Sequence, residues 1–442
     1  MKYYLGLDLG TTNCKCLLLG ENGEICASAS VACELLFTAG GVEQNAENWW
    51  DNAVLAIRRL LDASKVAPGC IEAVSISSQG ISGVPVDVNG VPLHNALSWL
   101  DARAGAETDV IKHKFDEEEM FKLTGKNALC YSFLQLMWFK NNLPEIYSKT
   151  WKYMLPLDYL NFKFTGKAVM DMSMASGTYA FDVSAHKWIK ELFSFADIPE
   201  SIFSDIGVMG DFVGHITKKA SDQTGLPPDT IVIMGAQDQR CASIGAGIAP
   251  GTATISLGTS AAVCSLIGRP LFDPERKVTC CAADSDHWVL ESAVTTACAA
   301  LDWAKDMFFR EYSHKEIDAM ASLAKKGAGG VAFTPNLSEN DKKGGGGVLS
   351  GFTLKTTKND IARAILEGIA IQLRDHLKNH EKLNQKINKA ILFGGGAASS
   401  VWARIISDIT EKEIAVPQTR ETAAYGAAVI AGAKKNFWNR GD

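Results

Sequence analysis

Apolar and polar stretches alternate at the start of the chain in a pattern that predicts three short strands joined by tight turns. Residues 3–9, 15–19 and 25–31 are mostly apolar, and Gly, Thr, Asn and Glu lie between them. Two tight turns between three apolar runs indicate a β-meander. Apolar residues then recur at helical spacing over 45–63, beginning at a favoured N-cap, and 71–77 predicts another strand. Strands on both sides of a helix predict an α/β fold.

The second half of the chain repeats this beginning. Residues 252–256 and 261–267 predict two strands around the turn at Gly258-Thr259, just as the first two strands enclose Gly10-Thr11. Two copies of one motif about half a chain apart indicate two related lobes. A single core also rarely exceeds roughly 250–300 residues, and this chain has 442. Small residues at 245–251 mark the boundary, so we predict lobes at 1–246 and 247–442.

Other segments complete the expected layout. Residues 101–212 mix helices with shorter pieces, and 230–234 and 390–393 predict buried strands. The remaining expected elements are helices at 359–371, 399–410 and 422–433 and a flexible loop at 342–347.

The bulk composition limits the classes of partner. The net charge of −6 argues against a broad nucleic-acid surface. No segment reaches the roughly 18 uninterrupted apolar residues of a membrane span, and the first residues lack the apolar core of a signal peptide. The eleven cysteines form no CxxC pair, which favours reduced, mostly buried thiols. We therefore expect a cytoplasmic protein that binds neither nucleic acid nor membrane.

The two Gly-Thr turns are the first candidate site. Such a hairpin presents backbone N–H groups and hydroxyls that suit phosphate oxygens. Asp8 ends the strand before the first turn, where a carboxylate is costly to bury unless it is paired or near a metal such as Mg²⁺. An ordinary turn with an Asx-type hydrogen bond is the alternative, which the second copy weakens. No GxxxxGK[ST] sequence occurs, which disfavours a P-loop nucleotide site.

Asp238 is the candidate general base. It follows the predicted strand at 230–234 and is flanked by Gln237 and Gln239. Phosphoryl transfer needs in-line positioning, charge neutralisation and a carboxylate that takes the proton of the accepting hydroxyl. Clefts form where the carboxyl ends of strands meet, which suits this position. A helix N-cap is an equally good interpretation from spacing alone.

Two further groups can contact a ligand. The glycines at 394–396 lie between a strand and a helix, where a flat ligand or a phosphate can approach, although a plain tight turn is the alternative. For Trp99, core packing is the favoured interpretation, because Trp is highly buried on average. As a group, however, the polar and aromatic residues near the ends of early elements are typical of a sugar site: Gln79, Trp99, Asp101 and Arg103.

At these residues the chain resembles the FGGY carbohydrate kinases, and the xylulose kinases among them most closely. A Gly-Thr loop by itself also occurs in actin-like chaperones and hexokinases, but the combination is specific. The matching stretches follow the family's order over nearly the whole chain: residues 6–12, 98–103, 155–160, 171–178, 235–239, 256–260, 347–367, 394–408 and 424–428.

The resemblance implies two ribonuclease-H-like lobes with ATP and a sugar bound between them. It implies ATP-dependent phosphorylation of a small sugar or polyol, a ketopentose such as D-xylulose being favoured, with Asp238 as the general base and Asp8 as the carboxylate associated with Mg²⁺. A homodimer is a further expectation. The residues implied around ATP are Thr11, Thr12, Lys15, Gly258, Thr259, Gly395, Gly396 and Ala397. The residues implied toward the sugar are Gln79, Gly80, Ile81, Asp101, Asp238 and Gln239.

The chain departs from the family pattern at several positions. Xylulose kinases usually read Gln-Met-His-Gly where this chain reads Gln79-Gly80-Ile81-Ser82, so Ile81 replaces an imidazole that would contact the sugar. Ser-Glu-Asn at 338–340 stands in place of Gly-Glu-Arg, Gln135 in place of a Lys, and the family's usual C-terminal tail is missing. These changes leave the exact sugar open.

Two other classes of function compete with a kinase. An actin-like ATPase or chaperone would need a peptide-binding domain, for which no length remains. A catalytically silent sugar-binding regulator would have lost Asp238 or a phosphate loop, and both are present.

Overall fold

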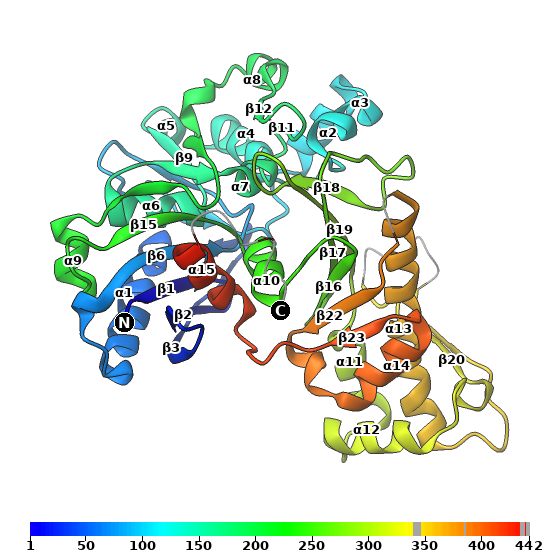
Figure 1. Cartoon of the computed structure of the whole chain (residues 1–442). Coiled ribbons are helices and arrows are strands. Elements are labelled where there is room, and N and C mark those ends of the chain that lie inside the picture. Colours follow the sequence, from blue (N-terminus) through cyan, green and yellow to red (C-terminus); the bar gives the residue numbers. More distant parts are fainter. Residues whose placement is uncertain (339–345, 384–385, 434–437, 439–442) are drawn as a thin grey trace. The chain divides into compact units, whose positions relative to one another are not determined.

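The computed structural model describes residues 1–338, 346–383, 386–433 and 438, and it divides into two compact units (Figure 1). The first unit is formed by Met1–Gly245, Gly268–Val289 and Glu421–Asp442, and the second by Ala246–Ile267 and Leu290–Arg420. The lobes predicted from the sequence are contiguous, whereas each unit is assembled from separated segments. The loop expected at 342–347 lies mostly outside the described residues, as do positions 339 and 340 of the departing Ser-Glu-Asn sequence.

The first unit is built on a six-stranded sheet in the order β14-β15-β6-β1-β2-β3. The first three strands along the chain form the predicted antiparallel meander, while β6 runs parallel to both β1 and β15. The carboxyl ends of β1, β6 and β15 therefore meet at one edge of the sheet. The strands are β1 (Tyr3–Leu9), β2 (Asn13–Gly20), β3 (Ile25–Ala32), β6 (Ile71–Ser78), β14 (Phe212–His215) and β15 (Ile231–Gln237).

Helices from both ends of the chain pack on this sheet. Helix α1 (Ala46–Ser64) begins as predicted, because the Asn45 side chain accepts a hydrogen bond from the Glu47 N–H. Helix α15 (Thr422–Ala433), red in Figure 1, packs against β1, which is dark blue. Gly6 permits this approach, since a Cβ there would stand 1.8 Å from the carbonyl oxygen of Ala424.

The rest of the first unit mixes helices and short strands, as expected for residues 101–212. Its further helices are α2 (Gly105–Lys114), α3 (Glu117–Thr124), α4 (Ser132–Asn142), α5 (Pro144–Tyr147), α6 (Pro156–Thr165), α7 (Met172–Ser176), α8 (Lys190–Ala196), α9 (Lys218–Thr224) and α10 (Asp238–Ala246). Its short strands are β4 (Leu36–Thr38), β5 (Gly41–Gln44), β7 (Val84–Val86), β8 (Ala96–Leu97), β9 (Lys152–Met154), β10 (Val169–Asp171), β11 (Phe181–Asp182), β12 (Lys187–Trp188), β13 (Asp205–Gly207) and β18 (Thr279–Ala282).

The second unit repeats the arrangement of the first. Strand β16 pairs antiparallel with β17, as β1 does with β2, and parallel with β22, as β1 does with β6. Within this unit the strand order is β19-β17-β16-β22-β23, and the predicted internal repeat is thus present in the fold. The strands are β16 (Thr252–Leu257), β17 (Ala261–Ile267), β19 (Trp288–Val294), β20 (Ala332–Thr334), β21 (Val348–Ser350), β22 (Lys389–Phe393) and β23 (Glu413–Ala415). The helices are α11 (Cys298–Phe308), α12 (His314–Leu323), α13 (Lys358–Leu383) and α14 (Ser400–Thr410).

The structure also tests the expectations for the cysteines and for membrane-spanning segments. All eleven cysteines lie in the described residues and none forms a disulfide; six of them are buried, and Cys26 and Cys70 are exposed. Within the described part of the chain, no helix is both long and apolar enough to cross a membrane.

Candidate active site

The segments that follow β1, β6 and β15 lie together at the carboxyl edge of the first sheet. The Gln79 N–H donates to the carbonyl of Leu9 at 2.9 Å, which joins the first two segments. A Cβ on Gly80 would stand 3.3 Å from Cγ of Gln237, so the second and third segments are also adjacent. The structure thus brings together several residues that the sequence predicts for a site: Asp8, Thr11, Gln79, Gly80 and Asp238.

A chain of hydrogen bonds links the first Gly-Thr turn to the end of β6. The Thr11 hydroxyl donates to Oε1 of Gln79 at 2.9 Å and accepts from the indole N–H of Trp99 at 2.9 Å. Gln44 accepts from Nε2 of Gln79 and donates to the Thr11 carbonyl. The core packing expected of Trp99 is wrong: Trp99 is 46% exposed, and its indole N–H bonds the Thr11 hydroxyl. Thr12 is exposed as well.

Asp8 is held from the neighbouring strand, not by an Asx turn. Its Oδ1 accepts from the Ser77 hydroxyl on β6 at 2.7 Å. Burial raises the pKa of Asp8 to about 6, although the Ser77 hydrogen bond and the charge of Lys15 lower it. Lys15 itself pairs with Glu421 at 2.7 Å. The pKa shift marks Asp8 as a carboxylate held in a site that disfavours its negative charge.

A magnesium ion near phosphates is commonly held by one or two carboxylates together with phosphate oxygens. Asp8 fits that role, because its carboxylate is an oxygen donor whose charge a cation would stabilise. Within the described residues, no cluster of three His, Cys, Asp or Glu side chains could hold a metal ion.

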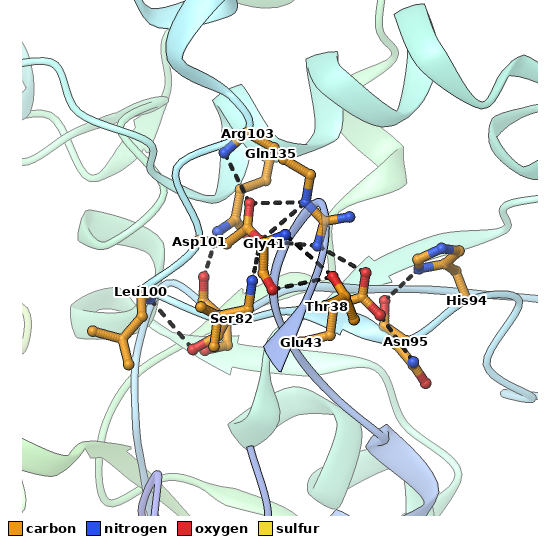
Figure 2. A network of polar contacts seen from close by, with 12 residues as sticks. Thr38, Gly41, Glu43, Ser82, His94, Asn95, Leu100, Asp101, Arg103 and Gln135 are labelled. Carbon is orange, nitrogen blue, oxygen red and sulfur yellow. Dashed lines mark hydrogen bonds and ion pairs between the residues drawn. The ribbon is translucent and has the colours of Figure 1, made fainter. Parts of the chain in front are cut away.

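Asp101 belongs to a dense polar network (Figure 2). Its carboxylate accepts from the Val42 N–H at 2.7 Å and from Nε of Arg103 at 3.0 Å, and a Cβ on Gly41 would stand 2.1 Å from its Oδ2. The Arg103 guanidinium also pairs with Glu43 at 2.8 Å. Burial alone would raise the pKa of Glu43, but hydrogen bonds from Asn95 and Arg103 lower it overall. This network fixes Asp101, and its predicted contact with the sugar stays a prediction.

Ile81, three residues after the end of β6, has a strained backbone conformation. Its φ angle is 68°, a left-handed conformation that is rare for a β-branched residue and costs about 1–3 kcal/mol. The Ser132 hydroxyl donates to the Ile81 carbonyl at 2.6 Å and holds the conformation. Gly80 and Ile81 are partly exposed, whereas Gln79 and Ser82 on either side are buried. Strain of this kind gathers at functional sites, which agrees with the predicted place of Ile81.

Asp238 stands where β15 passes directly into α10. The strand continues to Gln237, beyond the predicted end at residue 234, and a bulge lies between Ile233 and Ala236. Gly235 permits the bulge, since a Cβ there would stand 1.8 Å from the Ile76 carbonyl oxygen. Oδ1 of Asp238 accepts from the Gln239 N–H at 2.7 Å. A negative charge is favourable in a first helical turn, so the helix-start interpretation and the predicted base are compatible.

In the second unit the two predicted nucleotide segments also lie side by side. Because β16 and β22 are parallel neighbours, the turn at Gly258-Thr259 and the glycines at 394–396 leave the sheet at the same edge. Gly394 has φ 92°, and a Cβ on Gly395 would meet no atom within 4 Å. The Cys298 N–H at the start of α11 donates to the Gly258 carbonyl at 2.9 Å.

The glycine run does not lead straight into a helix as expected. A 3-10 turn at Gly395–Ala398 intervenes, and Ser399 then caps α14 by accepting from the Trp402 N–H. Ala397 is buried in this turn, while Gly395 is open. The open backbone of Gly395, not the start of α14, is therefore the part of this segment that a ligand can approach closely.

Family comparisons cover nearly the entire sequence. The N-terminal domain of the FGGY family of carbohydrate kinases matches residues 3–245, and the C-terminal domain of that family matches residues 253–434. The chain belongs to the FGGY family of carbohydrate kinases. It is thus a sugar kinase, and the expectations for family, enzyme class and fold are confirmed.

Relatives of this FGGY kinase act on more than one sugar. A xylulose kinase of Staphylococcus epidermidis is 29% identical over 436 residues, which is 97% of this chain and 87% of the relative. A gluconokinase of Bacillus subtilis is 28% identical over 454 residues, which is 97% of this chain and 86% of the relative. The crystal structure of a ligand-bound xylulose kinase from Lactobacillus acidophilus superposes with a TM-score of 0.90 at 26% identity, covering 98% of this chain and 89% of that one.

Several residues that contact the predicted site residues escaped the sequence analysis. Ser77 bonds Asp8, Gln44 joins Gln79 to Thr11, Glu43 pairs with Arg103, and Glu421 pairs with Lys15. The only sequence signal for Ser77 was its place at the end of a buried strand. Glu421 is about 400 residues from Lys15, and no local pattern relates the two.

Proposed function

We propose that this kinase transfers the γ-phosphoryl group of Mg-ATP to a hydroxyl of a small sugar or polyol, and that a ketopentose such as D-xylulose is the favoured substrate. The observation that carries the proposal is the meeting of three strand ends in the first unit. There the Gly-Thr turn, the Gln79–Ile81 segment and Asp238 share one sheet edge. Turns with backbone donors suit phosphates, and a carboxylate beside them suits the removal of a hydroxyl proton.

The proposed reaction is an in-line displacement. The substrate hydroxyl oxygen bonds to the γ-phosphorus, the bond from that phosphorus to the β–γ bridging oxygen breaks, and ADP leaves. The hydroxyl proton passes to the carboxylate of Asp238, which acts as the general base. Bound Mg²⁺ would neutralise charge on the phosphate oxygens, with Asp8 as its protein carboxylate.

The other residues bind and orient the two substrates. The proposed phosphate-binding residues of the first unit are Thr11, Thr12 and Lys15. Those of the second unit are Gly258 and Thr259. Gly395, Gly396 and Ala397 lie near the nucleoside part of ATP, and the missing side chain of Gly395 leaves room for it to approach. The sugar contacts Gln79, Gly80, Ile81, Asp101, Asp238 and Gln239.

The ion pairs around Asp101 favour a neutral sugar over an acidic one. The guanidinium of Arg103, in the network around Asp101, already pairs with the two carboxylates of Asp101 and Glu43. D-gluconate is the second candidate, because a gluconokinase is about as similar to this chain as the xylulose kinases are. Its carboxylate would need a cationic partner, and burying a charge without one is costly.

An ADP-release assay over a substrate panel tests the proposal. The panel holds D-xylulose and other pentuloses, hexuloses, D-gluconate, glycerol and erythritol, each with ATP and Mg²⁺. We expect sugar-dependent ADP release with the highest kcat/KM for a ketopentose. A higher kcat/KM for gluconate would favour the second candidate, and ADP release that no member of the panel increases would contradict the proposed function.

A further inference from the structure

Gln237 is a residue at the end of β15 that the sequence analysis placed only as a neighbour of Asp238. Its N–H donates to the Ser173 hydroxyl on α7 at 2.9 Å. On its other side, the absent side chain of Gly80 leaves room for its Cγ, which a Cβ on Gly80 would approach to 3.3 Å. Gln237 is therefore held between α7 and the end of β6, directly before the proposed base.

The hydrogen bond to Asp238 settles which way the Gln237 amide points. Nε2 of Gln237 donates to Oδ1 of Asp238 at 2.5 Å. A carboxylate oxygen only accepts, so the amide NH₂ must face Asp238 and the amide oxygen must face away from it. That oxygen, Oε1, is buried and has no hydrogen-bond partner among the described residues. Oε1 of Gln239, which follows Asp238 in the sequence, is also buried without a hydrogen-bond partner among the described residues.

A buried hydrogen-bond acceptor without a partner is unfavourable. In a binding site, such an acceptor indicates that the ligand supplies the missing donor. Oε1 of Gln237 belongs to the same amide group as Nε2, which touches Asp238. It therefore lies within about two hydrogen-bond lengths, roughly 6 Å, of that carboxylate. Neighbouring hydroxyls on a sugar chain can span such a distance when one of them faces the base.

We propose that Gln237 is a specificity-determining residue of this kinase. Its amide oxygen accepts a hydrogen bond from a substrate hydroxyl that neighbours the phosphorylated one, while its amide nitrogen orients Asp238. The inference rests on the proposed function and deepens it, because it requires a substrate with hydroxyls on adjacent carbons beside the reaction centre. A site that hydrogen-bonds a substrate hydroxyl rejects the analogue that lacks it, since its own polar group is then left unpaired.

Substitution of Gln237 by methionine separates the two roles. Gln237→Met keeps the length of the side chain and removes both the donor and the acceptor. The assay measures kcat/KM for the best sugar of the panel and for its monodeoxy analogues. The wild type should prefer the parent sugar over the analogue deoxygenated next to the phosphorylated hydroxyl by about 10- to 100-fold or more. Gln237→Met should reduce that preference to within about threefold. The two enzymes and the two sugars together form a double-mutant cycle, which tests whether Gln237 contacts the hydroxyl that the analogue lacks.

Loss of the donor to Asp238 should in addition lower kcat of Gln237→Met for every substrate alike, whereas a merely structural change would alter no ratio between analogues. Calorimetric binding of the parent sugar and the deoxy analogue, without nucleotide, gives a readout apart from turnover and should show the same loss of preference. Gln223→Met is the matched control: Gln223 lies on α9, where it accepts from the Trp50 indole N–H, and this variant should keep the wild-type preference.

The outcomes distinguish a failure of the proposed function from a failure of the role proposed for Gln237. If the wild type phosphorylates no sugar of the panel, both the proposed function and this inference are contradicted. If the wild type is active and Gln237→Met keeps the full preference against every monodeoxy analogue, the inference alone is overturned, and a water molecule is then the partner of Oε1.

Discussion

Asp8 and Asp238 are two carboxylates at one edge of the same sheet, and their surroundings differ in a way that suits two roles. Asp8 lies on β1, is half-buried, accepts from the Ser77 hydroxyl on β6 and has a raised pKa of about 6. Asp238 opens a helix and receives hydrogen bonds from the Gln237 side chain and the Gln239 backbone. The first environment would suit a carboxylate that binds a cation, and the second would suit the proposed general base.

Asp8→Asn should weaken the use of magnesium with little effect on the fold. The amide keeps the size of the side chain and can still accept from Ser77, but it is a neutral and poorer ligand for Mg²⁺. We expect the Mg²⁺ concentration for half-maximal ADP release to rise about 10- to 100-fold, the range found when groups that support a metal site are removed. Asp87→Asn, in a surface turn, is the control. An unchanged magnesium requirement would remove Asp8 from the proposed site.

At the scale of elements, the start of α10 is positioned by close contacts with α15. A Cβ on Gly426 would stand 1.8 Å from the carbonyl oxygen of Cys241, and a Cβ on Gly245 would stand 2.0 Å from that of Thr422. The two backbones therefore meet where neither helix can carry a side chain. Because Asp238 is the first residue of α10, this crossing also helps to place the proposed base.

Gly426→Ala should lower the stability of the protein by about 1–3 kcal/mol, the usual cost of forcing atoms into a tightly packed interior. Chemical denaturation monitored by tryptophan fluorescence measures the change. Gly105→Ala is the matched control, because a Cβ on Gly105 at the start of α2 would meet no atom within 4 Å. That variant should stay within about 0.5 kcal/mol of the wild type. Equal stability of the two variants would show that the helices do not meet as described.

Elements with a regular pattern and a clear boundary could be predicted from the sequence. The meander, the helix capped by Asn45 and the strands around both Gly-Thr turns are confirmed. Helix α13 was predicted to end at residue 371, yet it continues to Leu383. Leu373, Leu377 and His380 recur at helical spacing and are buried there, so tertiary packing extends the helix.

The strand ends that carry the site could also be predicted, but not the contacts between their side chains. The hydrogen bond of the Trp99 indole joins it to Thr11, which is 88 residues away in the sequence. The bulge before Asp238 depends on the close approach of Gly235 to β6. Both are consequences of how distant strands pair, and no local pattern of apolar and polar residues encodes them.

At the scale of the whole molecule, the two units share one strand arrangement, but the proposed sugar-binding residues and base lie in the first. That unit also buries carboxylates that are not in the predicted site. Asp158 on α6 accepts from the Ser204 hydroxyl and the Leu155 N–H, and burial raises its pKa from an ordinary 3.8 to about 7. Such a group makes the stability of the fold depend on pH.

The contribution of Asp158 should fall as the pH rises. Between about pH 4 and pH 7 the folded protein keeps a proton on Asp158 that the unfolded chain releases, so its contribution is fully present below pH 4 and is lost toward pH 7. Asp158→Asn mimics the neutral form at every pH. The stability of the wild type relative to this variant should drop by up to about 1.4 kcal/mol per pH unit in that window, measured by urea unfolding. A difference that does not change with pH would contradict the raised pKa.

The central claim is that Asp238 is the general base of a sugar kinase, and single-turnover phosphoryl transfer tests it most directly. The rate of ADP formation is measured by rapid quench for the wild type and Asp238→Asn, with saturating Mg-ATP and the best sugar of the panel. Asparagine keeps the shape of the side chain but cannot take the proton. The account predicts a rate about 10²- to 10⁴-fold lower in the variant, with sugar affinity little changed. A rate close to that of the wild type would contradict it.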